Sequence, residues 1–417
     1  MNIEILTIGD ELLLGQTVDT NAAFMARALA EIGVSVAQHD TVGDDPVLIA
    51  RAMREALERT GAVITTGGLG PTADDRTRSA LASVFGRELL MDDAVLGWLE
   101  ARFRTFGRVM PRNNVVQALV PVGARVLENQ YGTAPGLWLE DERGRWVVTL
   151  PGVPREMRGL LSGTVVPLLR ERAGTVPTVV ASRILRTTGI GESALAELLA
   201  DDGGDEVGGL PLAYLPGWEG VDLRVTVRGM PRQAADRALD AAAAKLYGRA
   251  GRYVYGEEKT DLAEVVLRLC RERSLSVATA ESCTGGLVGA RLTAVPGASD
   301  VYLGGIVAYA NRIKESLLGV PAELIRECGA VSERVAERMA AGVRERTGAA
   351  IGIGVTGIAG PGGGSAEKPV GTVWIAVEMD GAARKSGRVF VGDREEVRLR
   401  AAQAALDMVR TLVGAEP

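Results

Sequence analysis

The sequence predicts an α/β protein in which two α/β domains flank a small α+β module. Strand-like and helix-like runs alternate over the first 170 residues, which is the order of a doubly wound parallel sheet. At 417 residues the chain exceeds one ordinary hydrophobic core, so we expect several domains. Apolar residues make up 47% of the chain but aromatic residues only 4%, so Ala, Val and Leu must fill interiors in which helices pack closely on sheets.

Residues 1–172 contain the elements of the doubly wound sheet and form the first expected domain. The expected strands are residues 3–8, 34–42, 62–66 and 146–150. The expected helices begin at Thr20 and Pro46 and cover residues 77–85, 92–106 and 154–172. Pro154 favours the start of the last of these helices, because proline fits the first turn.

Two further domains are expected over residues 173–256 and 257–417. The middle one is a small α+β unit, with strands over residues 178–187, 221–227 and 252–255 and helices over residues 192–200 and 233–247. The last is again α/β, with strands over residues 276–280, 304–310, 350–355 and 371–377. Thr260 or Asp261 caps the helix that opens it, and its final helix covers residues 394–413.

Charge and hydropathy narrow the class of partner. The formal net charge of -6 argues against a general partner among nucleic acids or anionic membranes. No apolar run reaches the roughly 18 residues of a membrane span, and the start MNIEILTIGDE has no basic region followed by an apolar run. We therefore expect a cytoplasmic protein that binds small molecules and has no membrane partner.

Cysteine and histidine are too scarce for several common catalytic sites. Cys270, Cys283 and Cys328 are far apart and odd in number, as expected of reduced thiols. His39 is the only histidine. A histidine-containing catalytic triad or a histidine-rich metal site is therefore excluded outside that one neighbourhood.

The stretch GGLGPTADDRT follows the third expected strand, where ligands bind in open α/β sheets. Gly67, Gly68 and Gly70 let the backbone approach a ligand and expose amides that suit a phosphate. Asp74 and Asp75 add carboxylates, which fit beside a phosphate if a divalent cation bridges them. The simpler alternative is a glycine turn in which one of these aspartates caps the helix that follows.

Three other polar loops lie at strand ends in the same domain. They cover residues 9–21, 129–136 and 150–157 and carry the sequences GDELLLGQTVDTN, NQYGTAPG and LPGVPREM. Because the carboxyl ends of parallel strands meet at one edge of a sheet, we expect the four loops to form one pocket.

The last domain has two clusters of polar residues. In AESCTGG, Ser282 and Thr284 lie between a strand and a helix, where they can cap the helix or bind the phosphate of a nucleotide. The segment GASDVYLGGIVAYANRIK brings a second set onto a loop, a strand end and a helix start. That set is Ser299, Tyr309, Asn311 and Lys314.

A serine amidase without histidine needs a lysine or tyrosine as proton acceptor, and burial can lower a lysine pKa enough for that role. Ser299 and Lys314 fit this chemistry, although Lys314 taken alone would be a solvated surface residue. The glycine-rich loop over residues 355–372 is expected to be a flexible lid. Arg394 is either a phosphate ligand or a solvated residue at a helix start.

The four N-terminal loops resemble those of the CinA family (competence/damage-inducible protein A), whose N-terminal domain is similar to molybdopterin-binding domains. The resemblance covers all 417 residues, because that family also has a KH-like middle segment and a C-terminal nicotinamide-nucleotide amidase domain. It implies that the N-terminal domain hydrolyses ADP-ribose to AMP and ribose 5-phosphate with Mg²⁺, Mn²⁺ or Co²⁺. The implied metal-binding or water-activating carboxylates are Asp10, Glu11, Asp75 and Glu156, and the implied substrate-binding residues are Gly67, Gly68, Gly70 and Thr72.

For the C-terminal domain the resemblance implies deamidation of nicotinamide mononucleotide to nicotinate mononucleotide and ammonia through an acyl-enzyme, without a cofactor. Ser299, Tyr309 and Lys314 match the catalytic serine, tyrosine and lysine of the family, and Ser282 is the rival nucleophile. The implied substrate-binding residues are Ser282, Thr284, Gly285, Asn311, Thr356, Gly357 and Arg394.

The middle segment lacks a G-x-x-G loop flanked by basic residues, since GIGES carries a glutamate, so we expect no nucleic-acid partner. We expect a homodimer. Two alternatives stay open. Either the C-terminal domain alone is an enzyme and the N-terminal pocket only binds a pterin or nucleotide, or the protein is a non-catalytic partner in DNA uptake or repair.

Overall fold

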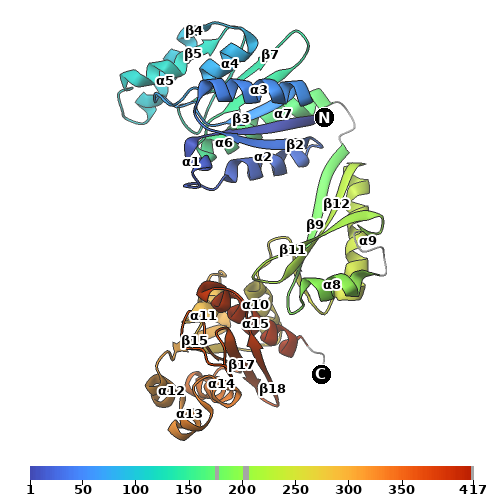
Figure 1. Ribbon diagram of the computed structural model, residues 1–417, viewed down its shortest axis with the longest axis vertical. Coiled ribbons are helices and arrows are strands. Elements are labelled where there is room, and N and C mark those ends of the chain that lie inside the picture. The colour runs from blue at the N-terminus through green and yellow to red at the C-terminus, as the bar shows by residue number, and fades with distance from the viewer. Residues whose placement is uncertain (174–177, 201–205, 415–417) are drawn as a thin grey trace. The chain divides into compact units, whose positions relative to one another are not determined.

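The computed structural model describes residues 1–173, 178–200 and 206–414 (Figure 1). The chain forms two compact units. The first unit consists of Met1–Ala181 and Val227–Ala238, and the second of Ser182–Thr226 and the chain from Leu239 onward. Within the described residues, no helix is long and apolar enough to cross a membrane.

The first unit contains a six-stranded sheet in the order β2-β1-β3-β8-β7-β6. Its strands are β1 (Asn2–Ile8), β2 (Ser35–Val42), β3 (Ala62–Thr66), β6 (Arg125–Leu127), β7 (Gly136–Glu140) and β8 (Trp146–Leu150). The first four in the sheet are parallel, and β7 and β6 add an antiparallel edge. The chain passes from β1 to β2 on one side and then to β3 on the other side of β1, so the direction of strand addition reverses between β1 and β3. The carboxyl ends of strands at such a reversal are the expected ligand site of an open α/β sheet.

Helices cover both faces of this sheet, so its strands are buried on both sides. They are α1 (Asp10–Leu13), α2 (Thr20–Ala30), α3 (Pro46–Thr60), α4 (Thr77–Phe85), α5 (Asp93–Thr105), α6 (Pro154–Leu160) and α7 (Val166–Ala173). Ile3 and Ile5 of β1 pack in one core with α2 and α6, while Leu6 and Ile8 pack in the other with α3 and α4. Figure 1 shows α2 and α3 on opposite faces.

Local sequence explains where these helices begin and end. Asp45 accepts hydrogen bonds from the amides of Val47 and Leu48, Pro46 occupies the first turn of α3, and Gly61 ends the helix in a left-handed conformation. A π-helical turn (Leu161–Val165) joins α6 to α7 where the sequence predicts one helix. Outside the main sheet lie the 3-10 helix Arg112–Ala118 and a small sheet of β4 (Leu89–Met91) and β5 (Leu119–Pro121).

The middle module has a five-stranded sheet in the order β10-β11-β12-β9-β13. Its strands are β9 (Thr178–Thr187), β10 (Glu206–Val207), β11 (Leu210–Pro216), β12 (Val221–Pro231) and β13 (Val254–Glu257), and its helices are α8 (Glu192–Leu199) and α9 (Arg232–Ala250). The expected α+β pattern is present, and the two-residue strand β10 and the seven-residue strand β11 were not predicted.

The C-terminal domain has a second five-stranded sheet, in the order β15-β14-β16-β17-β18. Its strands are β14 (Val277–Glu281), β15 (Tyr302–Val307), β16 (Ile351–Gly357), β17 (Thr372–Met379) and β18 (Ala382–Val389). The first three in the sheet are parallel and the last two antiparallel. The predicted α/β class is confirmed, whereas the edge strand β18 was not predicted.

Helices cover both faces of this sheet as well. They are α10 (Leu262–Glu272), α11 (Leu287–Thr293), α12 (Asn311–Leu318), α13 (Ala322–Cys328), α14 (Glu333–Thr347) and α15 (Arg394–Val413), with a 3-10 turn at Ala298–Asp300. Val277 of β14 faces the core that contains α10 and α15, and Ala278 and Ala280 face the core that contains α14. Asp393 and Glu396 form a capping box at the start of α15.

We predict that Gly342→Ala destabilises the second unit by more than about 2 kcal/mol, although alanine favours helices. A Cβ atom at Gly342 of α14 would lie 2.0 Å from the carbonyl oxygen of Leu318, so the two helices would have to separate. Gly248→Ala in α9 is the matched control. It meets no atom within 4 Å and should stabilise by roughly 0.5 kcal/mol. Urea unfolding of both variants measures this, and equal effects would contradict the packing argument.

Candidate functional site

The side chain of Lys314 is buried at the start of α12, with 2% of its surface exposed. Its ammonium donates hydrogen bonds to the hydroxyl of Ser282 (3.0 Å) and to the carbonyl oxygens of Ala308 (2.8 Å) and Tyr309 (3.4 Å). All three acceptors are uncharged. Burial disfavours the charged ammonium, and no charged acceptor offsets this effect. The pKa of Lys314 is therefore lowered from its ordinary value, which favours a neutral amine beside a serine hydroxyl.

Strand pairing and a buried carboxylate fix the position of Ser282. Its amide donates to the carbonyl of Val355 on β16, directly after β14 ends. The carboxylate of Glu281 accepts hydrogen bonds from the amides of Gly286, Val288 and Gly289. Glu281 therefore caps α11, a role that the sequence did not indicate. Neither Ser282 nor Thr284 caps this helix.

The structure does not bring Ser299 to Lys314, which corrects the predicted pairing. Ser299 is exposed in the turn before β15, whereas Ser282 follows the end of β14. Because β14 and β15 run parallel, Ser299 lies at the amino ends of these strands and Ser282 at their carboxyl ends. The six residues of β15 alone span about 20 Å. The serine at the buried amine is therefore Ser282.

Tyr309 and Arg394 lie together at the exposed side of this site. Arg394 donates to the hydroxyl of Tyr309 (2.8 Å) and to the carbonyl of Gly360 (2.6 Å). Four residues further along α15, Arg398 donates to the carbonyl of Thr284 (3.0 Å). The hydroxyl of Thr284 is fully buried and has no hydrogen-bond partner among the described residues. Helix α15 thus contacts both polar segments of the site.

The end of β16 closes the other side. Thr356 is buried and donates to the carbonyl of Ala330, and a Cβ atom at Gly357 would lie 3.0 Å from the sulfur of Cys283. Burial raises the pKa of Cys283 to about 12, so this thiol stays protonated and is a poor nucleophile. Asn311 is exposed at the first residue of α12, and Gly285 is exposed in the turn after Ser282.

The loop that the sequence predicts to be a flexible lid is tied down. The amide of Ile358 donates to the carbonyl of Thr372, and the amide of Gly371 donates to that of Ile358. The ammonium of Lys368 donates to the carbonyls of Cys328 (2.7 Å) and Val331 (2.8 Å). These bonds give the glycine-rich segment a defined shape beside the site.

A cavity of about 410 Å³ lies at the carboxyl ends of β1, β3 and β8 in the first unit. It is lined by the predicted residues Glu11, Gly67, Gly68, Gly70, Asp75 and Glu156 and by Asp44 and Gln117, which were not predicted. Asp44 follows β2 in an acidic turn, a pattern that could have indicated it, whereas nothing in the sequence indicated Gln117. Asp10 and Thr72 are not among the lining residues.

The carboxylate of Asp75 closes the glycine loop. It accepts hydrogen bonds from the amides of Gly70 (2.7 Å) and Thr72 (2.8 Å) and from the Thr72 hydroxyl. The buried guanidinium of Arg78 donates to the carbonyls of Leu69 and Gly70. The loop therefore holds its own shape, and Asp75 caps the loop instead of the helix that follows.

Other carboxylates of this cavity interact with each other or with nearby amides. Asp10 and Asp44 each accept a hydrogen bond from the other's amide. Burial, and then the charges of Asp10 and Glu11, raise the pKa of Asp44. Burial also raises the pKa of Glu156, whose carboxylate accepts a hydrogen bond from the amide of Asn129.

The expected metal site does not fit this arrangement. Over residues 1–173, 178–200 and 206–414, no three His, Cys, Asp or Glu side chains form a group that could hold a metal ion. Asp10, Glu11, Asp75 and Glu156 are near one cavity, but the oxygens of Asp75 already accept loop amides. Glu11, Asp75 and Glu156 line one acidic pocket, Asp10 lies beside it through its contacts with Asp44, and in the part of the chain that the structure describes these carboxylates form no ready-made metal centre.

Three family profiles match the chain in order. The probable molybdopterin binding domain matches residues 4–171, the damage-inducible protein CinA KH domain matches residues 182–256, and the CinA C-terminal domain matches residues 259–413. The predicted order of a molybdopterin-binding-like domain, a KH-like domain and a CinA C-terminal domain is confirmed.

Relatives match over nearly the whole length. The chain is 57% identical to a CinA-like protein of Gemmatimonas aurantiaca, over 98% of this chain and 96% of that protein. It is 44% identical to a CinA-like protein of Frankia casuarinae, over 100% of this chain and 97% of that protein. The crystal structure of the competence/damage inducible protein CihA from Agrobacterium tumefaciens, 42% identical, covers 37% of this chain and 94% of that chain with a TM-score of 0.36. The chain therefore belongs to the CinA family.

Proposed function

We propose that the C-terminal domain is a serine-type amidase that converts nicotinamide mononucleotide to nicotinate mononucleotide and ammonia. One observation carries this proposal: the buried amine of Lys314 lies 3.0 Å from the hydroxyl of Ser282 and has only uncharged acceptors around it. A neutral amine in that position can take the proton of the serine as its oxygen attacks the carboxamide carbon. The substrate follows from the family resemblance.

The proposed reaction has two steps. In the first, the Ser282 oxygen bonds to the carboxamide carbon, its proton passes to Lys314, and the same proton then leaves with the departing ammonia. In the second, water attacks the ester carbon and gives its proton to Lys314, which returns it to the serine oxygen. Tyr309, Asn311 and Arg394 at the exposed side are proposed to contact the nucleotide. No cofactor takes part.

Replacement of the two candidate serines distinguishes the nucleophile. We expect Ser282→Ala to abolish ammonia release from nicotinamide mononucleotide, because the attacking oxygen is removed. Ser299→Ala should retain activity within about twofold, because Ser299 lies at the amino ends of the parallel strands, away from Lys314. Circular dichroism checks that both variants fold. Loss of activity in Ser299→Ala alone would restore the original prediction and reject Ser282.

Lys314 should titrate in the pH profile of the amidase. The unprotonated amine is the active form, so the rate should rise with pH, with a midpoint below the ordinary lysine pKa of 10.5. Lys314→Ala should lose a factor of about 10² or more, and Lys314→Arg should be similarly inactive because a guanidinium stays charged. Lys259→Ala, at an exposed lysine, is the control.

The lowered pKa of Lys314 also predicts how the stability of the fold changes with pH. The unfolded chain holds the Lys314 proton more tightly than the folded chain does. Raising the pH from the lowered folded-state pKa towards 10.5 therefore stabilises the fold, and Lys314→Met should remove this increase. A flat stability profile in the unaltered protein, measured by urea unfolding, would show that the amine is not desolvated.

As a second function, we propose that the N-terminal domain hydrolyses ADP-ribose to AMP and ribose 5-phosphate. The cavity at the reversal point of the sheet supports this, because glycine amides there suit phosphates and burial raises the pKa of Glu156 towards that of a useful base. Glu156 is proposed to take the proton of the attacking water. The carboxylates present do not form a metal centre by themselves, so we assign no step to a metal ion.

Release of AMP from ADP-ribose tests the second function. We expect Glu156→Gln to reduce it by about 10² or more, because the amide cannot accept the proton, and the exposed Glu142→Gln to leave it unchanged. The assay is run with Mg²⁺, Mn²⁺ or Co²⁺ and with a chelator, and products are separated by chromatography. Absence of turnover under every condition would leave this domain as a nucleotide- or pterin-binding module.

A further inference from the structure

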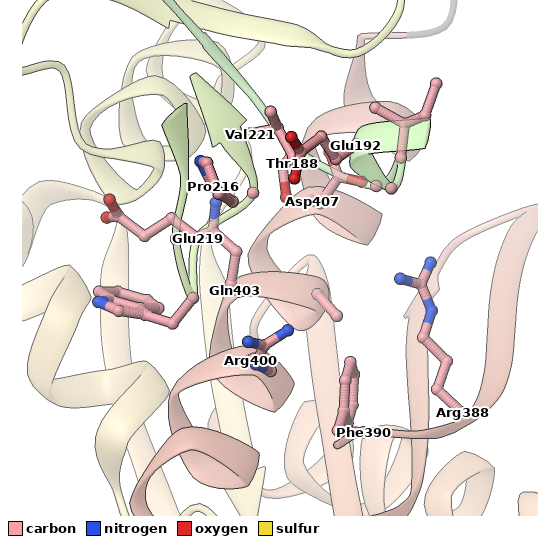
Figure 2. A pocket seen from close by; sticks show the side chains of 17 residues that line it. Thr188, Glu192, Pro216, Glu219, Val221, Arg388, Phe390, Arg400, Gln403 and Asp407 are labelled. Carbon is pink, nitrogen blue, oxygen red and sulfur yellow. The ribbon is translucent and has the colours of Figure 1, made fainter. Parts of the chain in front are cut away.

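A second cavity, of about 380 Å³, lies inside the second unit, where the middle module meets the C-terminal domain (Figure 2). Its walls are the loop 188–192 before and at the start of α8, the turn 216–221 between β11 and β12, and parts of β18 and α15. Figure 2 shows Thr188, Glu192 and Asp407 at the top of the view and Arg400 and Phe390 below them. None of these residues belongs to the amidase site or to the N-terminal cavity.

Two side chains of α15 in this cavity lack hydrogen-bond acceptors. Gln403 is 2% exposed, and its carbonyl oxygen accepts a hydrogen bond from Arg291 at 2.7 Å. Because a guanidinium only donates, this contact fixes the amide orientation and leaves the Gln403 nitrogen on the other side. Among the described residues that nitrogen has no partner, and neither has the buried Nε of Arg400 one helical turn away. Both groups need an acceptor.

The cavity wall holds three carboxylates (Glu192, Glu219 and Asp407) and two guanidinium groups (Arg388 and Arg400), but the ion pairs of two of the carboxylates leave the guanidinium groups available to an anion. Asp407 forms an ion pair with Arg410 (2.8 Å), and Glu219 forms one with Arg186. Glu192 is exposed at the rim. Arg400, by contrast, lines the cavity without an ion pair to any described residue. A guanidinium and an amide on one helix face offer a phosphate or carboxylate several donors in a fixed geometry.

Other walls suit a flat ring and hydroxyl groups. Phe390 lines the cavity near Arg400, and Trp218 lines it while its ring packs under Arg291, 5.3 Å from the guanidinium carbon. Gly191 begins α8 without a side-chain cap, so the first amides of that helix have no side-chain acceptor. Glu192 and Glu219 can accept hydrogen bonds from hydroxyl groups. A cavity of this volume holds a small ligand of mononucleotide size.

The geometry points to a mononucleotide site in this cavity, with the phosphate on Arg400 and Gln403 and the base against Phe390. The site is separate from both proposed catalytic pockets, and its occupation does not depend on either activity. On this proposal, the surface between the KH-like module and the C-terminal domain binds a small nucleotide and not a nucleic acid.

Calorimetric titration of the full-length chain with AMP tests the assignment. Besides any binding of AMP as a product in the N-terminal cavity, we expect a binding event with a Kd below about 1 mM that weakens about tenfold or more in Arg400→Gln, because a charge-assisted contact is lost. Ala404→Leu, which fills the cavity from the same helix, should weaken it as well. Arg384→Gln, an exposed arginine of β18 outside the cavity, should leave it unchanged. Thermal unfolding checks that each variant is folded.

Three further probes separate the chemical parts of the ligand. Ribose 5-phosphate, inorganic phosphate and adenosine should each bind more weakly than AMP at the event that Arg400→Gln removes. The assignment is overturned if AMP binding is the same in Arg400→Gln and Ala404→Leu as in the unaltered chain. It is also overturned if inorganic phosphate binds there as tightly as AMP, since the ring would then contribute nothing.

Discussion

The burial of the Lys314 ammonium is the constraint on which the C-terminal site depends. Taking a lysine amine out of water costs several kcal/mol unless its protons find acceptors. Here the acceptors come from the segment after β15 and from Ser282 after β14, so the carboxyl ends of two strands must converge on one nitrogen. Because none of these acceptors is charged, they offset the cost of burying the ammonium only in part, and the pKa of Lys314 is lowered from its ordinary value.

The remaining parts of the site hold the acceptors in position. Glu281 binds three amides of the turn after Ser282, and the pairing of β14 with β16 holds the serine amide. A Cβ atom at Gly357 would lie 2.7 Å from Val373 and 2.8 Å from the carbonyl oxygen of Thr372, so glycine at this position lets the end of β16 pair closely with β17. The polar contacts around Ser282 are thus set by strand pairing and a buried carboxylate, and the serine needs no histidine to orient it.

The alternation of strands and helices along the chain and the residues at strand ends could be predicted from the sequence, because periodicity and loop chemistry are local properties. The pairing of Ser299 with Lys314 could not. Both residues lie in one short segment, but the strand between them, which the sequence predicts over residues 304–310, carries the chain from the amino end of the sheet's parallel strands to their carboxyl end. Ser282 is 32 residues from Lys314, and only the parallel pairing of β14 and β15 brings them together. The carboxylates near the glycine loop were found for the same local reason, but sequence does not show that the oxygens of Asp75 are used by loop amides.

Helix α15 gives the amidase site and the cavity at the KH-like module a common wall. Its capping box fixes where the helix begins, and Arg394 and Arg398 in its first turns bind the segments around the amidase site. Arg400 and Gln403 follow within the next turns and line the cavity. Arg398 and Arg400 lie on one helix, so a ligand that displaced α15 as a unit would also change the contact between Arg398 and Thr284. Coupling between the two sites would then be limited by how differently the ligand binds the two positions of one helix, and it would act equally in both directions.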